Sequence, residues 1–172
     1  MVKLKLVVTD ACIFIDLYDL DLVGVFFDLD IEVHTTSAVM FELYHDQSQV
    51  LKAYQSVGRL TVHNLVESDF DEIYAASYSR ALSEADKSVL HIAAKINACV
   101  LSSDKAVRNC AKNKDIDYHG MLWIFDRLVE LKLLSRKQAA SKLKQLVATN
   151  FIYQNNKRLM NEISKRLKAW NV

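Results

Sequence analysis

The sequence predicts an α/β fold: a three-layer α/β/α domain with a mostly parallel sheet of four to five strands and a helical C-terminal tail. Three observations lead to this prediction. Short runs rich in Val, Ile and Leu alternate with longer segments of helical periodicity. The short runs are apolar at nearly every position, as expected for strands that helices cover on both faces. From residue 121 onward, every segment has helical periodicity.

The elements follow one another with few interruptions. We expect strands in KLKLVVTD, IEVHTT, RLTVHNL, ACVLSS and IDYHG. We expect helices over residues 11–30, 37–58 (one helix or two), 68–82, 83–97, 104–114, 121–134, 135–150 and 156–172. Because the chain has no proline, internal repeat or linker, it predicts a single domain over 1–172, with a core at about 3–120 and a helical extension at about 121–172.

Composition narrows the class of protein. A chain of 172 residues with 51% hydrophobic and 25% charged residues can bury a sizeable core. No apolar run reaches the roughly 18 residues of a membrane span, and charges interrupt the N-terminal stretch where a signal peptide would be apolar. We therefore expect a cytoplasmic protein with no membrane contact. The three cysteines show no CxxC spacing and predict buried free thiols, and the five histidines show no metal-ligand spacing.

Charge is distributed unevenly along the chain. Residues 1–86 hold 15 acidic against 5 basic residues, whereas residues 131–172 hold 10 basic residues and the single acid Glu162. This asymmetry is consistent with an anionic partner on the basic part and a cation on the acidic part. Solvated helix faces are the simpler explanation, so charge alone does not select a function.

Four acidic residues stand where a parallel sheet places ligands. Asp10 directly follows the first expected strand, and Asp104 follows the strand ACVL after two serines. Glu42 and Asp86 lie one helical segment away. Because ligands bind at the carboxyl ends of parallel strands, we expect the strand before Asp10 to be central and the strand before Asp104 to lie beside it. Each acid also has a structural explanation. Asp10 and Asp104 can cap helices, and Glu42 can be an exposed helix residue. Asp86 can form a capping box with Ser83.

The order and local context of the four acids resemble the PIN-domain nucleases. LVVTDACIFIDL resembles the first strand of that family with its aspartate, and VHTTSAVMFEL resembles the second motif with its glutamate. The stretch LSEADKSVLHIAAKINACVLSSDKAVRNCA resembles the most specific part of the pattern, and the likeness covers about residues 3–120. Beyond it, YHGMLWIFDRLVELKLLSRKQAASKLKQL resembles the helical tail of the branch related to VapC-type toxins.

The resemblance implies a metal-dependent endoribonuclease that hydrolyses phosphodiester bonds of single-stranded RNA. Its catalytic residues would be Asp10, Glu42, Asp86 and Asp104, which with the Ser102 hydroxyl would also bind the metal. Oxygen ligands of this kind select Mg²⁺ or Mn²⁺. We expect Asp10 and Asp104 to bind one ion directly, and Glu42 and Asp86 to bind it through water. Without metal, at least one of these carboxyl groups should have a raised pKa.

The resemblance also implies macromolecular partners. RNA needs a basic surface outside the acidic pocket. Candidates for this surface are Lys105, Arg108, Lys112, Lys165, Arg166 and Lys168. The protein would be the toxin of a toxin–antitoxin pair, with an antitoxin that inserts an Arg or Lys among the carboxylates. Apolar faces in SAVMFELY and MLWIFDRL favour a homodimer.

Two other interpretations stay open at this point. The chain could be a PIN-fold binding module for RNA or protein that is catalytically weak or inactive. A phosphatase of the HAD type also begins with an Asp at the end of a strand, but it needs a second Asp two residues later, where this chain has Cys12.

Overall fold

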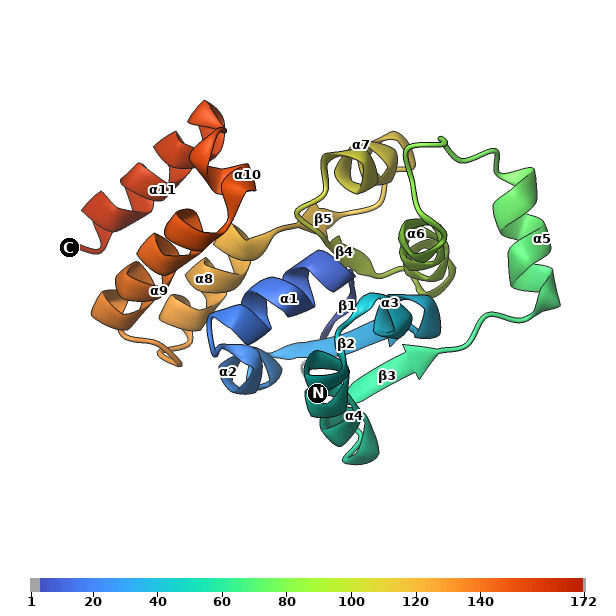
Figure 1. Cartoon of the computed structure of the whole chain (residues 1–172), viewed down its shortest axis with the longest axis horizontal. Coiled ribbons are helices and arrows are strands. Elements are labelled where there is room, and N and C mark those ends of the chain that lie inside the picture. The colour runs from blue at the N-terminus through green and yellow to red at the C-terminus, as the bar shows by residue number, and fades with distance from the viewer. Residues whose placement is uncertain (1–3, 172) are drawn as a thin grey trace. The chain divides into compact units, whose positions relative to one another are not determined.

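A computed structural model describes residues 4–171 and confirms the α/β class (Figure 1). Five strands form one sheet in which every pair is parallel, in the order β3-β2-β1-β4-β5. The strand before Asp10 is central and the strand before Asp104 lies beside it, as expected. The strands are β1 (Lys5–Thr9), β2 (Ile31–Thr36), β3 (Leu60–His63), β4 (Cys99–Leu101) and β5 (Tyr118–His119).

The helices account for most of the remaining chain. Their bounds are α1 Ala11–Asp19, α2 Val23–Phe27, α3 Ser37–Glu42, α4 His45–Ser56, α5 Glu67–Ala75, α6 Glu84–Ile96, α7 Lys105–Asn113, α8 Met121–Glu130, α9 Arg136–Thr149, α10 Phe151–Gln154 and α11 Lys157–Ala169. Within residues 4–171, every helix is too short or too polar to cross a membrane.

Three differences from the expected elements have local causes. The expected helix 11–30 is two helices, because Asp21 adopts a left-handed backbone conformation with φ 54° between them. The expected helix 68–82 ends at Ala75, and Ser77 shortly after it has a left-handed backbone with φ 51°. The segment 37–58, expected as one helix or two, is two helices separated at Leu43. Helix α10 was not expected, and Asn150 begins it by accepting a hydrogen bond from the backbone N–H of Ile152. Lys3 and Val172, at the two ends of the expected elements, lie outside the described residues.

The chain divides into two compact units. Unit 1 contains the residues up to Ile15 together with Asp30–Met121, and unit 2 contains Asp16–Leu29 together with the residues from Leu122 onward. Residues 16–29 thus group with the C-terminal helices from Leu122 onward. That the chain is a single domain stays a prediction.

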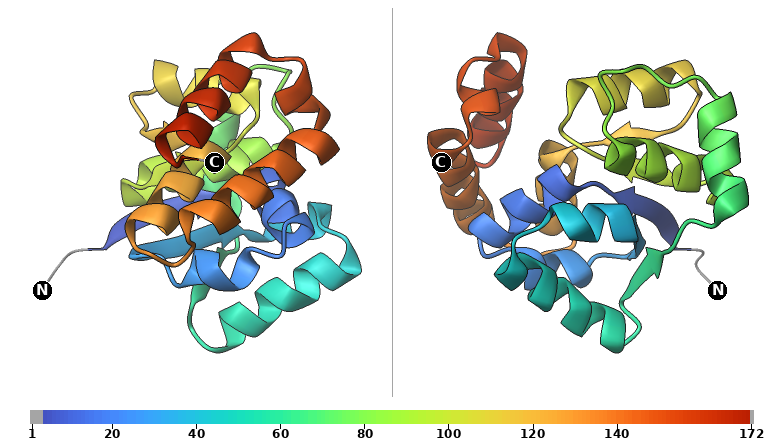
Figure 2. Two further views of the ribbon diagram at one scale, coloured as in Figure 1. Left: turned by 90° about the vertical axis from the view of Figure 1, so that its left-hand side faces the viewer. Right: turned by 45° about the vertical axis from the view of Figure 1, so that its right-hand side comes forward.

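Unit 1 buries the sheet between helices. Its crossovers run from β2 out to β3, then back to β4 and on to β5, so right-handed connections place helices on both faces. Both views in Figure 2 show α4 on one side of the strands and α6 and α7 on the other. Helix α6 packs against β1, β2 and β4. Val8 and Val100, which are neighbours in the β1–β4 ladder, are fully buried, so the carboxyl ends of these strands rest on a rigid core.

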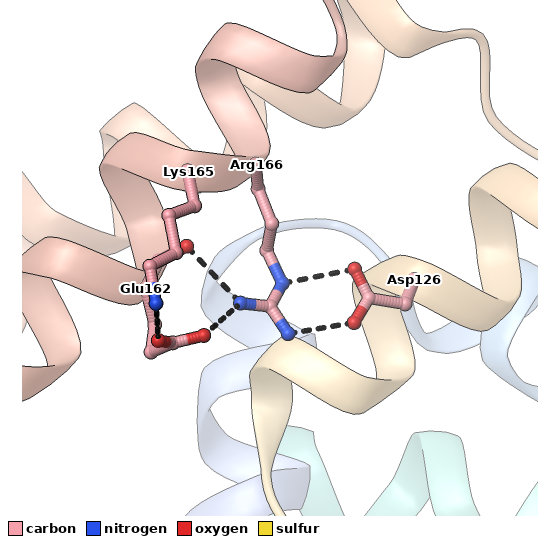
Figure 3. A network of polar contacts seen from close by, with 4 residues as sticks. All are labelled: Asp126, Glu162, Lys165 and Arg166. Carbon is pink, nitrogen blue, oxygen red and sulfur yellow. Dashed lines mark hydrogen bonds and ion pairs between the residues drawn. The ribbon is translucent and has the colours of Figure 1, made fainter.

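Within unit 2, an ion-pair network and apolar packing hold helices α8 and α11 together. The guanidinium of Arg166 on α11 donates to both carboxylate oxygens of Asp126 on α8, at 2.9 and 2.7 Å (Figure 3). Arg166 also pairs with Glu162 one turn earlier, at 3.3 Å. Apolar side chains such as Phe125 and Leu143 are fully buried in the same unit. The bidentate pair therefore ties α11 to α8 in a defined orientation.

One buried carboxyl group in unit 2 lacks a full set of partners. Oδ1 of Asp16, on α1, accepts a hydrogen bond from Nδ2 of Asn150 at 2.9 Å. Oδ2 is buried and has no partner among the described residues. Burial raises the pKa of Asp16 to about 6, and the hydrogen bond from Asn150 opposes that rise only in part. The ionised form therefore costs stability at neutral pH.

We predict that Asp16→Asn stabilises the protein at pH 8, by about 1–2 kcal/mol of unfolding free energy. The pKa of Asp16 is raised to about 6 in the folded state from an ordinary 3.8, so the parental protein gains stability as the pH falls through this interval and loses it as the pH rises. The advantage of the variant should therefore be full above pH 6 and vanish near pH 4. Urea unfolding at both pH values measures this, and an equal difference at pH 4 and pH 8 would contradict it.

Candidate functional site

Asp10 is the buried centre of the acidic cluster in unit 1. It follows β1, and its backbone N–H continues the ladder by donating to the carbonyl of Leu101 at 3.0 Å. Its side chain is only 3% exposed. Oδ1 accepts from the backbone N–H of Ala11 at 2.7 Å, and Oδ2 accepts from the Ser102 hydroxyl at 2.7 Å. The strand pairing thus brings the two strand ends together at the switch point of the sheet, where ligands bind in such folds.

Ser102 links Asp10 to Asp104. While its hydroxyl donates to Asp10, its oxygen accepts from the backbone N–H of Asp104 at 3.1 Å. The side chain of Asp104 caps α7, with Oδ1 accepting from the N–H groups of Ala106 and Val107 at 2.8 and 3.0 Å. Asp104 is exposed and therefore stands at the surface of the site. The structural explanation for this residue is correct, and a metal-binding role must share the carboxylate with the cap.

Glu42 and Asp86 are connected through Ser83. Asp86 and Ser83 form the capping box that their spacing suggested: Oδ2 of Asp86 accepts from the N–H of Ser83 at 2.7 Å, and Oγ of Ser83 accepts from the N–H of Asp86 at 3.1 Å. The same Ser83 hydroxyl donates to Oε1 of Glu42, the last residue of α3, at 3.4 Å. Ser83 therefore takes part both in the capping box with Asp86 and in a hydrogen bond to Glu42, and so connects these two acidic residues.

The carboxyl groups of Asp10, Glu42 and Asp86 influence one another. Burial is the main cause that raises the pKa of Asp10, and the negative charge of Asp86 raises it further, while the Ser102 hydrogen bond lowers it. Burial also raises the pKa of Glu42, followed by the charges of Asp10 and Asp86. The expected rise in pKa is present, but burial contributes more to it than like-charge repulsion.

Cys12, expected only as a buried thiol, contacts Asp10 and Ser102 in the acidic cluster. Its Sγ donates to Oδ2 of Asp10 at 3.5 Å, lies 3.6 Å from Oγ of Ser102, and accepts from the N–H of Ser103 at 3.3 Å. Burial and the neighbouring Asp10 charge raise the pKa of Cys12 to about 12, so it remains a thiol and is no nucleophile. Its position two residues after Asp10, on the first turn of α1, was the available signal. All three cysteines are free, as expected, but only Cys99 is buried, whereas Cys12 and Cys110 are partly exposed.

The donor set fits a hard divalent cation in kind and in charge. All the candidate groups are carboxylates or a hydroxyl, which are the ligands of Mg²⁺ and Mn²⁺. None of the ion pairs among residues 4–171 involves Asp10, Glu42, Asp86 or Asp104. Repelling carboxylates that form no ion pair with a basic side chain are stabilised by a bound cation. No group of three or more His, Cys, Asp and Glu side chains in the described part of the chain is already arranged as a metal cage.

Arg108 is the most enclosed of the expected RNA-binding residues on α7. It is half-buried and stacks over the Tyr118 ring, with its guanidinium carbon 5.1 Å from the ring centre. A methyl group at Gly120 would lie 3.3 Å from Nη1 of Arg108 and 3.6 Å from the carbonyl oxygen of Ser102. The absence of a side chain at Gly120 therefore leaves room for the Arg108 guanidinium beside the carbonyl oxygen of Ser102. Lys105 and Lys112 on the same helix are exposed.

The basic residues expected on α11 differ in their availability. Arg166 is held by Asp126 and Glu162, so much of its charge is already neutralised within unit 2 (Figure 3). Lys165 is exposed and pairs with Glu162 at 2.7 Å. Lys168 is exposed and is in none of the ion pairs between described residues. A role in RNA binding stays a prediction for all three.

The fold and the acidic edge of its sheet together define a class of protein. It is an all-parallel five-stranded α/β fold with acidic residues at the carboxyl ends of its two central strands. A family model named DUF3368 and described as a PIN domain matches residues 6–169. The chain therefore belongs to the PIN-domain family, as its motifs suggested. PIN domains are generally nucleases and typically use divalent metal ions. No curated protein in the comparison gave a significant match.

We predict that Asp10→Asn raises the melting temperature by roughly 2–5 °C in EDTA at pH 8. The raised pKa means that ionised Asp10 costs stability above that pKa, and the variant removes the charge while keeping an acceptor for Ala11. Added Mn²⁺ should stabilise the parental protein more than the variant. Thermal melts with and without Mn²⁺ test this, with Asp71→Asn on exposed α5 as the control. A variant less stable than its parent in EDTA would contradict it.

Proposed function

We propose that the protein is a metal-dependent endoribonuclease that hydrolyses phosphodiester bonds of single-stranded RNA. The observation that carries this proposal is the buried Asp10 carboxyl group at the switch point of the sheet, electrostatically coupled to Asp86 and Glu42 and paired with no basic side chain in the described chain. Such an arrangement lowers the stability of the fold, and a structural role alone gives no reason for that loss. Membership of a family of nucleases supports the same conclusion.

The residues of the site have different roles in the proposed activity. Asp10, Glu42, Asp86 and Asp104 would hold a Mg²⁺ or Mn²⁺ ion, with Ser102 as a weaker contributor. Bound there, the cation supplies a polarised water and neutralises charge on the reacting phosphodiester. Ser102 fixes the Asp10 carboxyl group through its 2.7 Å hydrogen bond, and Ser83 fixes Glu42 relative to Asp86. Cys12 donates its thiol hydrogen to Oδ2 of Asp10 without entering the chemistry.

A second candidate function is a PIN-fold module that binds RNA or protein without cleaving it. One observation favours it: Asp86 and Asp104 each use a carboxylate oxygen in a helix cap, which is reason enough to have an acid at these positions. The raised pKa of Asp10 favours the enzyme, because a helix cap does not require burial of the carboxylate.

We further propose that the enzyme is a cytoplasmic toxin held inactive by an antitoxin. An unneutralised acidic pocket is a complementary target for an inserted Arg or Lys side chain. For the proposed homodimer, Phe41 and Tyr44 are 89% and 80% exposed and can supply an apolar contact. On α8, Ile124 and Phe125 are fully buried, so the second contact we expected there would rest on half-buried side chains such as Leu122 and Trp123.

We predict that the protein cleaves single-stranded RNA with Mg²⁺ or Mn²⁺, that EDTA abolishes the cleavage, and that Asp10→Asn or Asp104→Asn lowers its rate at least about a hundredfold. Asn keeps the shape but removes the charge that holds the cation. Binding of an uncleavable RNA analogue, followed by fluorescence anisotropy, should persist. Asp71→Asn is the matched control. A parental protein that binds RNA but cleaves none would support the binding-module function. An Asp10→Asn variant that melts at a lower temperature than its parent yet cleaves at the parental rate would show that these acids are structural.

We predict that the double variant Lys105→Gln with Lys112→Gln weakens RNA binding and lowers the slope of log affinity against log salt by about 0.7 for each lost phosphate contact. The metal site should be unaffected, so saturating RNA should restore the cleavage rate. Lys165→Gln with Lys168→Gln tests α11 in the same way, and Lys52→Gln on exposed α4 is the control. An unchanged salt slope would exclude that helix from the RNA surface.

A further inference from the structure

Two hydroxyl links join α3, which carries Glu42, to the first turns of α6, which carry Asp86. One link is buried and connects Thr36, the N-cap of α3, with Ser88 at 2.7 Å between their Oγ atoms. The other lies at the surface and connects Ser83 with Glu42 at 3.4 Å. The start of α3 is thus tied to a later residue of α6, and its end to the N-cap of α6.

The buried link has a defined direction. Ser88 donates its hydroxyl proton to the carbonyl of Ala85 at 2.7 Å, so its oxygen can only accept from Thr36. The oxygen of Thr36 in turn accepts from the N–H of Val39 at 3.2 Å. Both side chains are almost completely buried, at 0% and 1% exposure. Every group in this chain of hydrogen bonds is satisfied, from the first turn of α3 to the carbonyl next to Asp86.

The two links fix the register of the helices. At 1.5 Å per residue, the six steps from Thr36 to Glu42 span about 9 Å, and the five steps from Ser83 to Ser88 span about 7.5 Å. These lengths agree with two antiparallel helices linked at both ends. Apolar packing does little to fix α3, because Val39 is its only buried side chain in the described structure. Its position along α6 therefore depends on the hydroxyl links.

We infer that Thr36 and Ser88 are positioning residues that set the separation of the Glu42 and Asp86 carboxylates, and through it the affinity of the site for a divalent cation. The inference rests on the proposed function. Neither hydroxyl contacts the cation. An apolar pair could fill the same space, but it would not specify how far α3 slides along α6, since apolar contacts are not directional.

The test measures Mn²⁺ binding to the full chain by electron paramagnetic resonance of the free ion, well below the melting temperature. Thr36→Val and Ser88→Ala should each weaken Mn²⁺ affinity about tenfold, the size of effect seen for residues that orient metal ligands. Thr36→Ser keeps the hydroxyl and should bind Mn²⁺ like the parent. Ser48→Ala is the matched control, because Ser48 donates to the carbonyl three residues earlier in α4, at 2.9 Å, just as Ser88 does in α6.

A double variant, Thr36→Val with Ser88→Ala, separates positioning from stability. In both variants the N–H of Val39 loses its acceptor, but only Thr36→Val also leaves the buried Ser88 oxygen without its donor, so the double variant should melt closer to the parent than Thr36→Val does. Its Mn²⁺ affinity should stay about tenfold weaker than that of the parent. If affinity returns together with stability, or if Ser88→Ala binds Mn²⁺ like the parent, the positioning role is wrong. A parental chain that binds no Mn²⁺ overturns the proposed function itself, and this role with it.

Discussion

The hydrogen bond from the Ser102 hydroxyl to Oδ2 of Asp10, at 2.7 Å, is the interaction on which the acidic cluster depends. It joins the ends of the two central strands and gives a carboxyl group that is 3% exposed one of its few partners. A buried carboxyl group without such donors would be too costly to keep ionised. Because the Ser102 oxygen also accepts from the N–H of Asp104, one hydroxyl sets the spacing between the β1 and β4 ends of the site.

Around this centre, the same residues serve both stability and the candidate site. Asp86 closes a capping box and also raises the pKa of Asp10 and Glu42 through its charge. Asp104 caps α7 while it stands at the edge of the cluster. This double use explains why the structural interpretation of Asp86 and Asp104 as helix caps is correct and still incomplete. Helix N-termini favour negative charge, so a fold can bring several acids together at the ends of its strands with less loss of stability.

Basic residues that look equivalent in the sequence differ in the structure. Arg166 is committed to Asp126 and Glu162 and stabilises unit 2, whereas Lys168 is exposed. Arg108 stacks over Tyr118, in space that the missing side chain of Gly120 leaves open. Charge patterning along a chain therefore identifies where an anionic partner can bind, but the ion pairs decide which cations remain available to it.

The sequence by itself determined the α/β class, the central place of the strand before Asp10 and the local caps. These follow from apolar runs, helical periodicity and short-range spacing, such as the three-position spacing from Ser83 to Asp86. It could not show the second role of Ser83, the contact of Cys12 with Asp10, or the unpaired oxygen of Asp16. Only the tertiary structure decided these, and the bond between Thr36 and Ser88, because residues 52 positions apart meet through strand order and helix packing. Such contacts depend on how every element between the two residues folds, so they cannot be predicted from a local sequence pattern.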